Sequence, residues 1–140
     1  MTWSLDNIQE LGSLGVSPHL ENNGEIYQLY YSSLERGGLA IDGMSSDLQL
    51  TQQGVIPGPH DLTIVTTNQG IRRAYFIDKD EICTALISED GLTLSEKTSI
   101  GISNNNNKKA WGVPDAVILP DGKIRIYWVD DDPETNTQAD

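Results

Sequence analysis

The sequence WGVPDAVILPDGKIRIYWVD, residues 111–130, has the pattern of a β-hairpin. Its first strand is the short apolar run 116–119, and Pro-Asp-Gly at 120–122 forms the turn. Proline presets φ, aspartate bonds to nearby backbone amides, and glycine takes the left-handed position that such a turn requires. The return strand alternates, so one face is expected to carry Ile124, Ile126 and Trp128, and the other Lys123, Arg125, Tyr127 and Val129.

The same strand–turn–strand design occurs twice more upstream, which predicts a repeat protein. Each copy has an aromatic pair in its returning strand, and these pairs begin at Tyr30, Tyr75 and Tyr127, 45 and 52 residues apart. A polar loop at 101–109, with four consecutive asparagines, accounts for the longer second interval. The copies are predicted at residues 17–56, 57–100 and 111–140 of a single domain covering 1–140.

The second copy is the most complete, with four short strands joined by turns, which is the size of one propeller blade. The predicted fold is therefore all-β: β-propeller-type repeats of four-stranded antiparallel blades, about two to three of them in an incomplete ring. A single sheet cannot bury both of its faces, so the blades must stack on one another. The chain is expected to be a fragment, an open partial propeller, or a protomer that completes the ring as a homo-oligomer.

The two ends of the chain have weaker patterns. Residues 1–16 are predicted as an irregular segment or the last strand of an incomplete unit, with a short helix over 5–11 as the alternative. The third copy is expected to stop after its second strand, because the polar tail that follows has no further strand pattern. No signal peptide is visible at the N-terminus, and the compartment is left unspecified.

Composition excludes several classes of partner. A net charge of −12 argues against nucleic acid, since nothing would neutralise its phosphates. No apolar run approaches the length of a membrane span. Cys83 is the single cysteine, so an internal disulfide is excluded and a small buried hydrophobe is its ordinary role. The acidity itself serves solubility or, alternatively, a site for a cation or a sugar.

Residues 114–128 resemble the blade motif of glycosidase-type propellers, which include the five-bladed arabinanase, xylosidase and fructosidase group and the six-bladed sialidases. Residues 88–93, Ser-Glu-Asp-Gly-Leu-Thr, resemble the turn between the third and fourth strands of those blades, and also a shortened sialidase Asp-box. The resemblance covers roughly residues 17–130 and implies a glycoside hydrolase-like propeller that acts on or binds carbohydrate. A non-catalytic binding or interaction module on the same scaffold is the alternative.

Under this resemblance, the catalytic candidates are Asp61, as the general base, and Asp115, as the residue that tunes the general acid. Inverting hydrolysis needs two carboxyl groups roughly 6.5–9.5 Å apart. The alternative is that both aspartates cap strand corners. The chain departs from the family pattern: Leu62 replaces its proline, Leu20 stands where the first copy would have an aspartate, and no glutamate occupies a matching blade start.

Four further residues are candidates for substrate binding: His60, His19, Trp111 and Arg73. His19 and His60 are predicted at equivalent corners, with a structural role near proline as the alternative. For Trp111, the alternative is packing between blades, as is usual for aromatic residues in strands. For Arg73, which is equivalent to Arg125, the alternative is an ion pair with strand carboxylates. No cofactor is implied and no pair has metal-ligand spacing, so the acidic run at 130–132 is interpreted as solvated.

Overall fold

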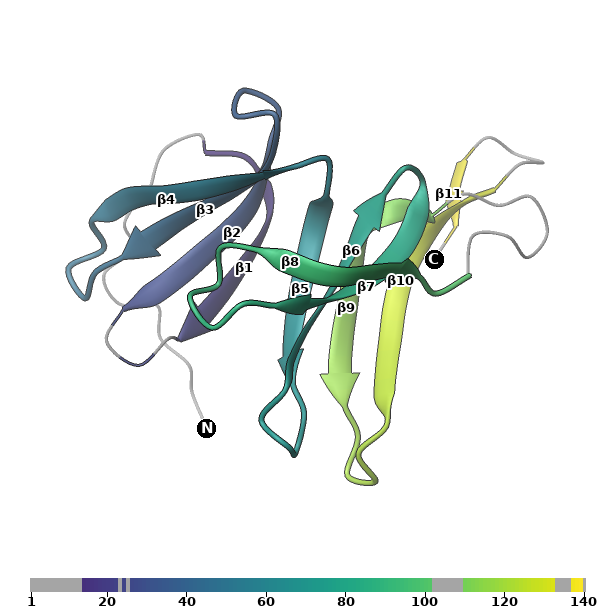
Figure 1. The fold of residues 1–140 in the computed structure, drawn as a ribbon. Coiled ribbons are helices and arrows are strands. Elements are labelled where there is room, and N and C mark those ends of the chain that lie inside the picture. The colour runs from purple at the N-terminus through teal and green to yellow at the C-terminus, as the bar shows by residue number, and fades with distance from the viewer. Residues whose placement is uncertain (1–13, 23, 25, 102–109, 133–136, 140) are drawn as a thin grey trace, which may run out of the picture.

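The computed structural model describes residues 14–101 (except 23 and 25), 110–132 and 137–139, with the side chains of 110, 111, 130–132 and 137–139 left outside the description. These residues form antiparallel strands and no helix, which confirms the all-β prediction (Figure 1). Sheet 1 contains β1 (Val16–Asn22), β2 (Tyr27–Ser33), β3 (Gly38–Met44) and β4 (Leu50–Pro57). Sheet 2 contains β5 (His60–Thr66), β6 (Arg72–Asp78), β7 (Glu81–Ile87) and β8 (Leu94–Ser99). Sheet 3 contains β9 (Ala110–Ile118), β10 (Ile124–Asp132) and β11 (Thr137–Ala139).

The glycine-containing turns form as the sequence predicts. In the β9–β10 hairpin the amide of Gly122 donates to the carbonyl of Leu119 at 2.8 Å, and Gly122 has a φ of +83°. In the β5–β6 hairpin Gly70 donates to Thr67 at the same distance, with a φ of +78°. A left-handed backbone is costly for residues with a Cβ, so glycine at these positions sets where each hairpin reverses.

The three sheets stack face to face, as blades of an incomplete propeller do. Tyr30, Leu39 and Ile41 of sheet 1 pack against Leu62, Ile64, Phe76 and neighbouring residues of sheet 2, Cys83 among them. The opposite face of sheet 2 receives sheet 3 through the cluster Val65, Tyr75, Ala116, Ile118, Ile124 and Ile126. The alternation predicted for 123–129 is thus confirmed, since Ile124 and Ile126 point inward while Arg125 and Tyr127 are exposed.

The first strands of the three sheets share one irregularity. The pairing register skips from Val16 to His19 in β1, from His60 to Thr63 in β5, and from Gly112 to Asp115 in β9. Each skip is a β-bulge, with two residues opposite one. The first residue of each bulge has positive φ without being glycine: Ser17 at 53°, Asp61 at 52° and Val113 at 46°.

The register at the bulges shows that two pairs of residues aligned between copies from the sequence are not equivalent in the structure. His19, Thr63 and Asp115 pair with Tyr30, Tyr75 and Tyr127 respectively, so these three residues occupy the same position in their sheets. His19 and His60 are therefore not equivalent, contrary to the sequence prediction. The counterpart of Asp61 in the first copy is Ser17 rather than Leu20, because each of the two is the first residue of its bulge.

The third copy is longer than expected. β10 extends to Asp132, and a short strand, Thr137–Ala139, pairs with it, although the sequence predicted no strand beyond residue 130. Backbone pairing does not require an apolar pattern at a sheet edge, which is why hydropathy missed β11. The predictions for residues 1–13 and for the asparagine-rich loop at 102–109 lie outside the described residues.

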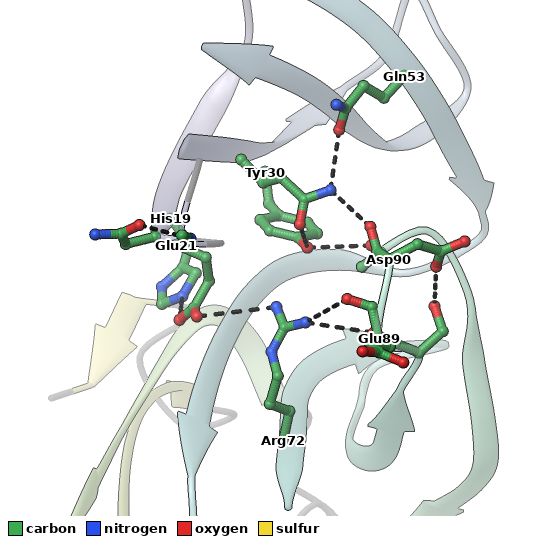
Figure 2. A network of polar contacts seen from close by, with 12 residues as sticks. His19, Glu21, Tyr30, Gln53, Arg72, Glu89 and Asp90 are labelled. Atoms are coloured by element: carbon green, nitrogen blue, oxygen red, sulfur yellow. Dashed lines mark hydrogen bonds and ion pairs between the residues drawn. The ribbon is translucent and has the colours of Figure 1, made fainter. Parts of the chain in front are cut away.

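The turn between β7 and β8 joins sheet 2 to sheet 1, as Figure 2 shows. The side-chain amide of Gln28 donates to the carbonyl of Asp90 at 2.7 Å, and the hydroxyl of Tyr30 donates to the carbonyl of Gly91 at 3.1 Å. Arg72 donates to the carbonyl of Glu89 at 3.2 Å. Residues 88–93 thus form a polar contact between sheets rather than a free surface loop.

Alanine substitutions at Gly70 and Gly91 separate backbone strain from this contact. Both glycines have left-handed φ, so each substitution is expected to cost about 1–2 kcal/mol. A Cβ at Gly70 would meet nothing within 4 Å, whereas one at Gly91 would clash with the side-chain oxygens of Gln28 and Tyr30. Those side chains are buried and hydrogen-bonded, so Gly91→Ala should cost about 1–3 kcal/mol more in urea unfolding. Equal losses for the two variants would contradict a tight contact between the sheets.

Candidate functional site

Asp61 sits at the point where all three sheets meet. Its backbone amide donates to the hydroxyl of Ser32 in β2 at 2.7 Å, and that hydroxyl donates to Oδ1 of Asp61 at 3.0 Å. Oδ2 accepts from the amide of Val113 in β9 at 3.2 Å and lies 3.1 Å from Nδ1 of His60. The carboxylate thus connects sheet 1, its own sheet 2 and sheet 3. We refer to these contacts of Asp61 as the aspartate clamp.

The clamp alters the acidity of both partners. Burial alone would raise the pKa of Asp61, but the hydrogen bonds from His60, Ser17, the Val113 amide and Ser32 outweigh it and hold that pKa well below its usual range. The hydrogen bond to Asp61 raises the pKa of His60 despite the burial of the ring, and the charges of Asp78 and Asp80 add to this. The pair therefore favours an ionised aspartate beside a protonated histidine.

The three bulges converge on one small cleft, which we call the axial cleft. Its volume is about 210 Å³, and it is lined by the bulge triplets of all three first strands, 17–19, 61–63 and 113–115. Asp115 is exposed, and its Oδ1 lies 3.4 Å from the hydroxyl of Thr63 in the neighbouring strand. Residues that occupy equivalent positions in successive sheets thus meet around a common axis.

A second cleft of about 560 Å³ opens beside Asp61, between sheets 1 and 2. Its lining includes Val16, Ser32, Leu34, Pro59 and His60. The imidazole of His60 is 42% exposed and borders this second cleft rather than the axial one. Asp61 lines both clefts, so the clamp forms the wall between them.

The structure brings together three of the six residues that the sequence singled out. Asp61, Asp115 and His19 line the axial cleft, while His60 borders its neighbour. Arg73 does not line either cleft; its guanidinium donates to the hydroxyl of Thr84 within sheet 2 at 3.3 Å, not to a carboxylate. Trp111 belongs to the backbone of β9, but its side chain lies outside the described part of the chain.

Sequence reasoning missed three residues that shape the site: Ser17, Ser32 and Thr63. Thr63 could have been found from its spacing, since it precedes Tyr75 by 12 positions just as Asp115 precedes Tyr127. Ser32 has no such signal, because its contact with Asp61 crosses from one sheet to the next.

His19 is held by a network that continues to sheet 2 (Figure 2). Its Nε2 lies 2.9 Å from Oε1 of Glu21, and the other oxygen of Glu21 lies 3.9 Å from the guanidinium of Arg72. Arg72 also donates to the carbonyls of the β7–β8 turn. The orientation of His19 at the cleft therefore depends on the packing of sheet 2 against sheet 1.

The described residues contain neither a metal-binding cluster nor a membrane-spanning helix. Nowhere in them do three His, Cys, Asp or Glu side chains gather closely enough to hold a metal ion. The same residues contain no helix with the length and hydropathy that a membrane span requires.

Comparison of the chain with protein-family models, with curated proteins and with solved structures finds no match.

The aspartate clamp predicts a pH-dependent loss of stability in Asp61→Asn. A carboxylate whose folded pKa is lowered stabilises the protein above its unfolded pKa of about 3.8, and this contribution is lost as the pH falls through the folded pKa. His60 makes stability depend on pH at the alkaline side as well. Its pKa is raised above 6.5, so its contribution to the unfolding free energy is lost as the pH rises through the raised value. The difference in unfolding free energy between wild type and variant is therefore expected to peak between these limits, at about 2 kcal/mol.

Urea unfolding across this pH range measures that difference. Asp115→Asn is the matched control, because it makes the same substitution in the same cleft without touching the clamp. A difference for Asp61→Asn that is independent of pH would show that the ion pair does not contribute to stability.

Proposed function

We propose that this chain is a carbohydrate-binding module of propeller type, which holds a sugar in the axial cleft without hydrolysing it. The observation that carries the proposal is the convergence of His19, Thr63 and Asp115, one residue from the same position of each sheet, on one cleft. The resemblance of residues 88–93 and 114–128 to glycosidase-type blades supports carbohydrate as the class of ligand.

The cleft has the groups that a polyhydroxylated ligand needs. The exposed carboxylate of Asp115 accepts hydrogen bonds, and the hydroxyl of Thr63 both donates and accepts them. Pro18 and Pro114 supply apolar walls beside these polar groups. Small-molecule sites commonly combine apolar walls with a few well-placed polar groups, which fix the orientation of the ligand.

The state of Asp61 favours binding over hydrolysis. A general base works best when its pKa lies near the working pH, and the clamp holds the pKa of Asp61 far below it. The oxygens of Asp61 already accept hydrogen bonds from two neighbouring sheets, so activating a water would compete with the contacts that join them. No glutamate stands among the residues that line the axial cleft in the described part of the chain, so a general acid would have to come from elsewhere.

Calorimetry with a panel of neutral mono- and disaccharides tests the proposal. We expect at least one sugar to bind, and Asp115→Asn to weaken that binding about tenfold or more, since a hydrogen bond to a charged group contributes about 1.5–3 kcal/mol. Asp121→Asn is the matched control, because it removes a carboxylate in the β9–β10 turn that does not line the cleft.

Incubation with aryl glycosides distinguishes the hydrolase alternative. We expect no release of the aryl group by wild type. Hydrolysis that Asp61→Asn and Asp115→Asn both abolish would establish an enzyme instead, and the absence of binding to every sugar of the panel would refute a carbohydrate module.

A further inference from the structure

The outer face of sheet 3 presents apolar side chains that the equivalent face of sheet 2 buries. Val117 and Tyr127 are 41% and 54% exposed, whereas Val65 and Tyr75, at the same register positions of sheet 2, are 8% and 6% exposed. In sheet 2 these positions are covered by sheet 3. We call the exposed face of sheet 3, which carries Val117, Arg125 and Tyr127, the trailing face.

The outer face of sheet 1 also exposes apolar side chains, at the register positions with which sheet 3 packs on sheet 2. Leu20 and Tyr27 are 48% and 40% exposed, and they occupy the register positions of Ala116 and Ile124 in sheet 3. Ala116 and Ile124 are the residues with which sheet 3 packs on sheet 2. Leu29, at the position of Ile126, is already buried beneath Leu14 and Leu50, so the exposed part of this face carries Leu20 and Tyr27. We call that exposed part the leading face. Figure 1 shows sheets 1 and 3 at opposite ends of the molecule, with sheet 2 between them.

We propose that two copies of this chain associate head to tail, the trailing face of each packing on the leading face of the other, to form a six-sheet ring. At the positions of Ala116 and Ile124, the contact would repeat between copies the arrangement that joins sheet 2 to sheet 3 within one copy. A single chain carries both halves of the interface, so a second copy fits without any other partner.

Symmetry and blade number support a pair. A head-to-tail contact generates a closed ring when its rotation closes, and two copies then share two identical seams. Closed propellers have about four to eight blades, and two copies of three sheets fall within that range. The ring would bring the axial clefts of both copies to a common centre, so each site would gain a wall that three sheets alone do not supply.

The seams would be weaker than the contacts within a chain. The position of Asp61 is taken by Val113 in sheet 3 and by Ser17 in sheet 1, so no aspartate clamp crosses a seam. Each copy also carries a net charge of −12, which opposes association. Association is therefore expected to be reversible, and to strengthen as added salt screens the repulsion.

Sedimentation velocity over a range of micromolar concentrations tests the proposal. Wild type is expected to shift from monomer to dimer, and Tyr127→Lys and Leu20→Lys are each expected to remain monomeric. Lysine lowers the net negative charge, so general repulsion cannot explain the loss. Leu34→Lys is the matched control: Leu34 is fully exposed in the β2–β3 turn, off both faces, and this variant should dimerise like wild type. Circular dichroism checks that each variant is folded.

Mixing the two face variants identifies the geometry. In a head-to-tail pair, one seam would combine both lysines while the other would be wild type on both sides, so an equimolar mixture should recover dimer that neither variant forms alone. A wild type that stays monomeric throughout the range would overturn the proposal. So would normal dimerisation of Leu20→Lys together with loss in Tyr127→Lys, because that result would mean that trailing faces pack on each other.

Discussion

The structure depends on the stacking of sheets that are apolar on both faces. Sheet 2 is the clearest case, since one face is covered by Tyr30, Leu39 and Ile41 of sheet 1 and the other by Ile118, Ile124 and Ile126 of sheet 3. Neither face could be left in water without losing the free energy of apolar burial, roughly 25 cal/mol per Å². The propeller-like order of the sheets therefore follows from the need to cover each face, and the axial cleft forms where the first strands of stacked sheets meet.

The hydrogen bonds of Asp61 fix how the apolar sheets are positioned against one another. Its contacts with Ser32 and Val113 specify how far each neighbouring sheet slides along the first strand of sheet 2, which apolar contacts alone do not specify. The same contacts lower its pKa and occupy its oxygens, so the residue that most resembles a catalytic base has the environment of a structural one.

The candidate site was only partly predictable. Asp61 and Asp115 were selected through the resemblance of their segments to glycosidase-type blades, and the structure places both on the axial cleft. Arg73 was selected by residue type, but its position in the second strand turns it toward Thr84. Thr63 was overlooked because threonine in a strand is ordinary, although its pairing with Tyr75 matches that of Asp115 with Tyr127.

The sequence by itself determined most of the strands, the hairpin turns and the existence of three copies, because alternation and turn glycines such as Gly70 and Gly122 act over a few residues. It did not determine β11, which has no such pattern. Only the tertiary structure decided the register of the first strands. Ser17, Asp61 and Val113 share a left-handed backbone but no residue type, so nothing local marks the bulge. The bulge is held by contacts between sheets, such as that of Asp61 with Ser32, and those contacts join residues 29 positions apart that meet only after the sheets have stacked.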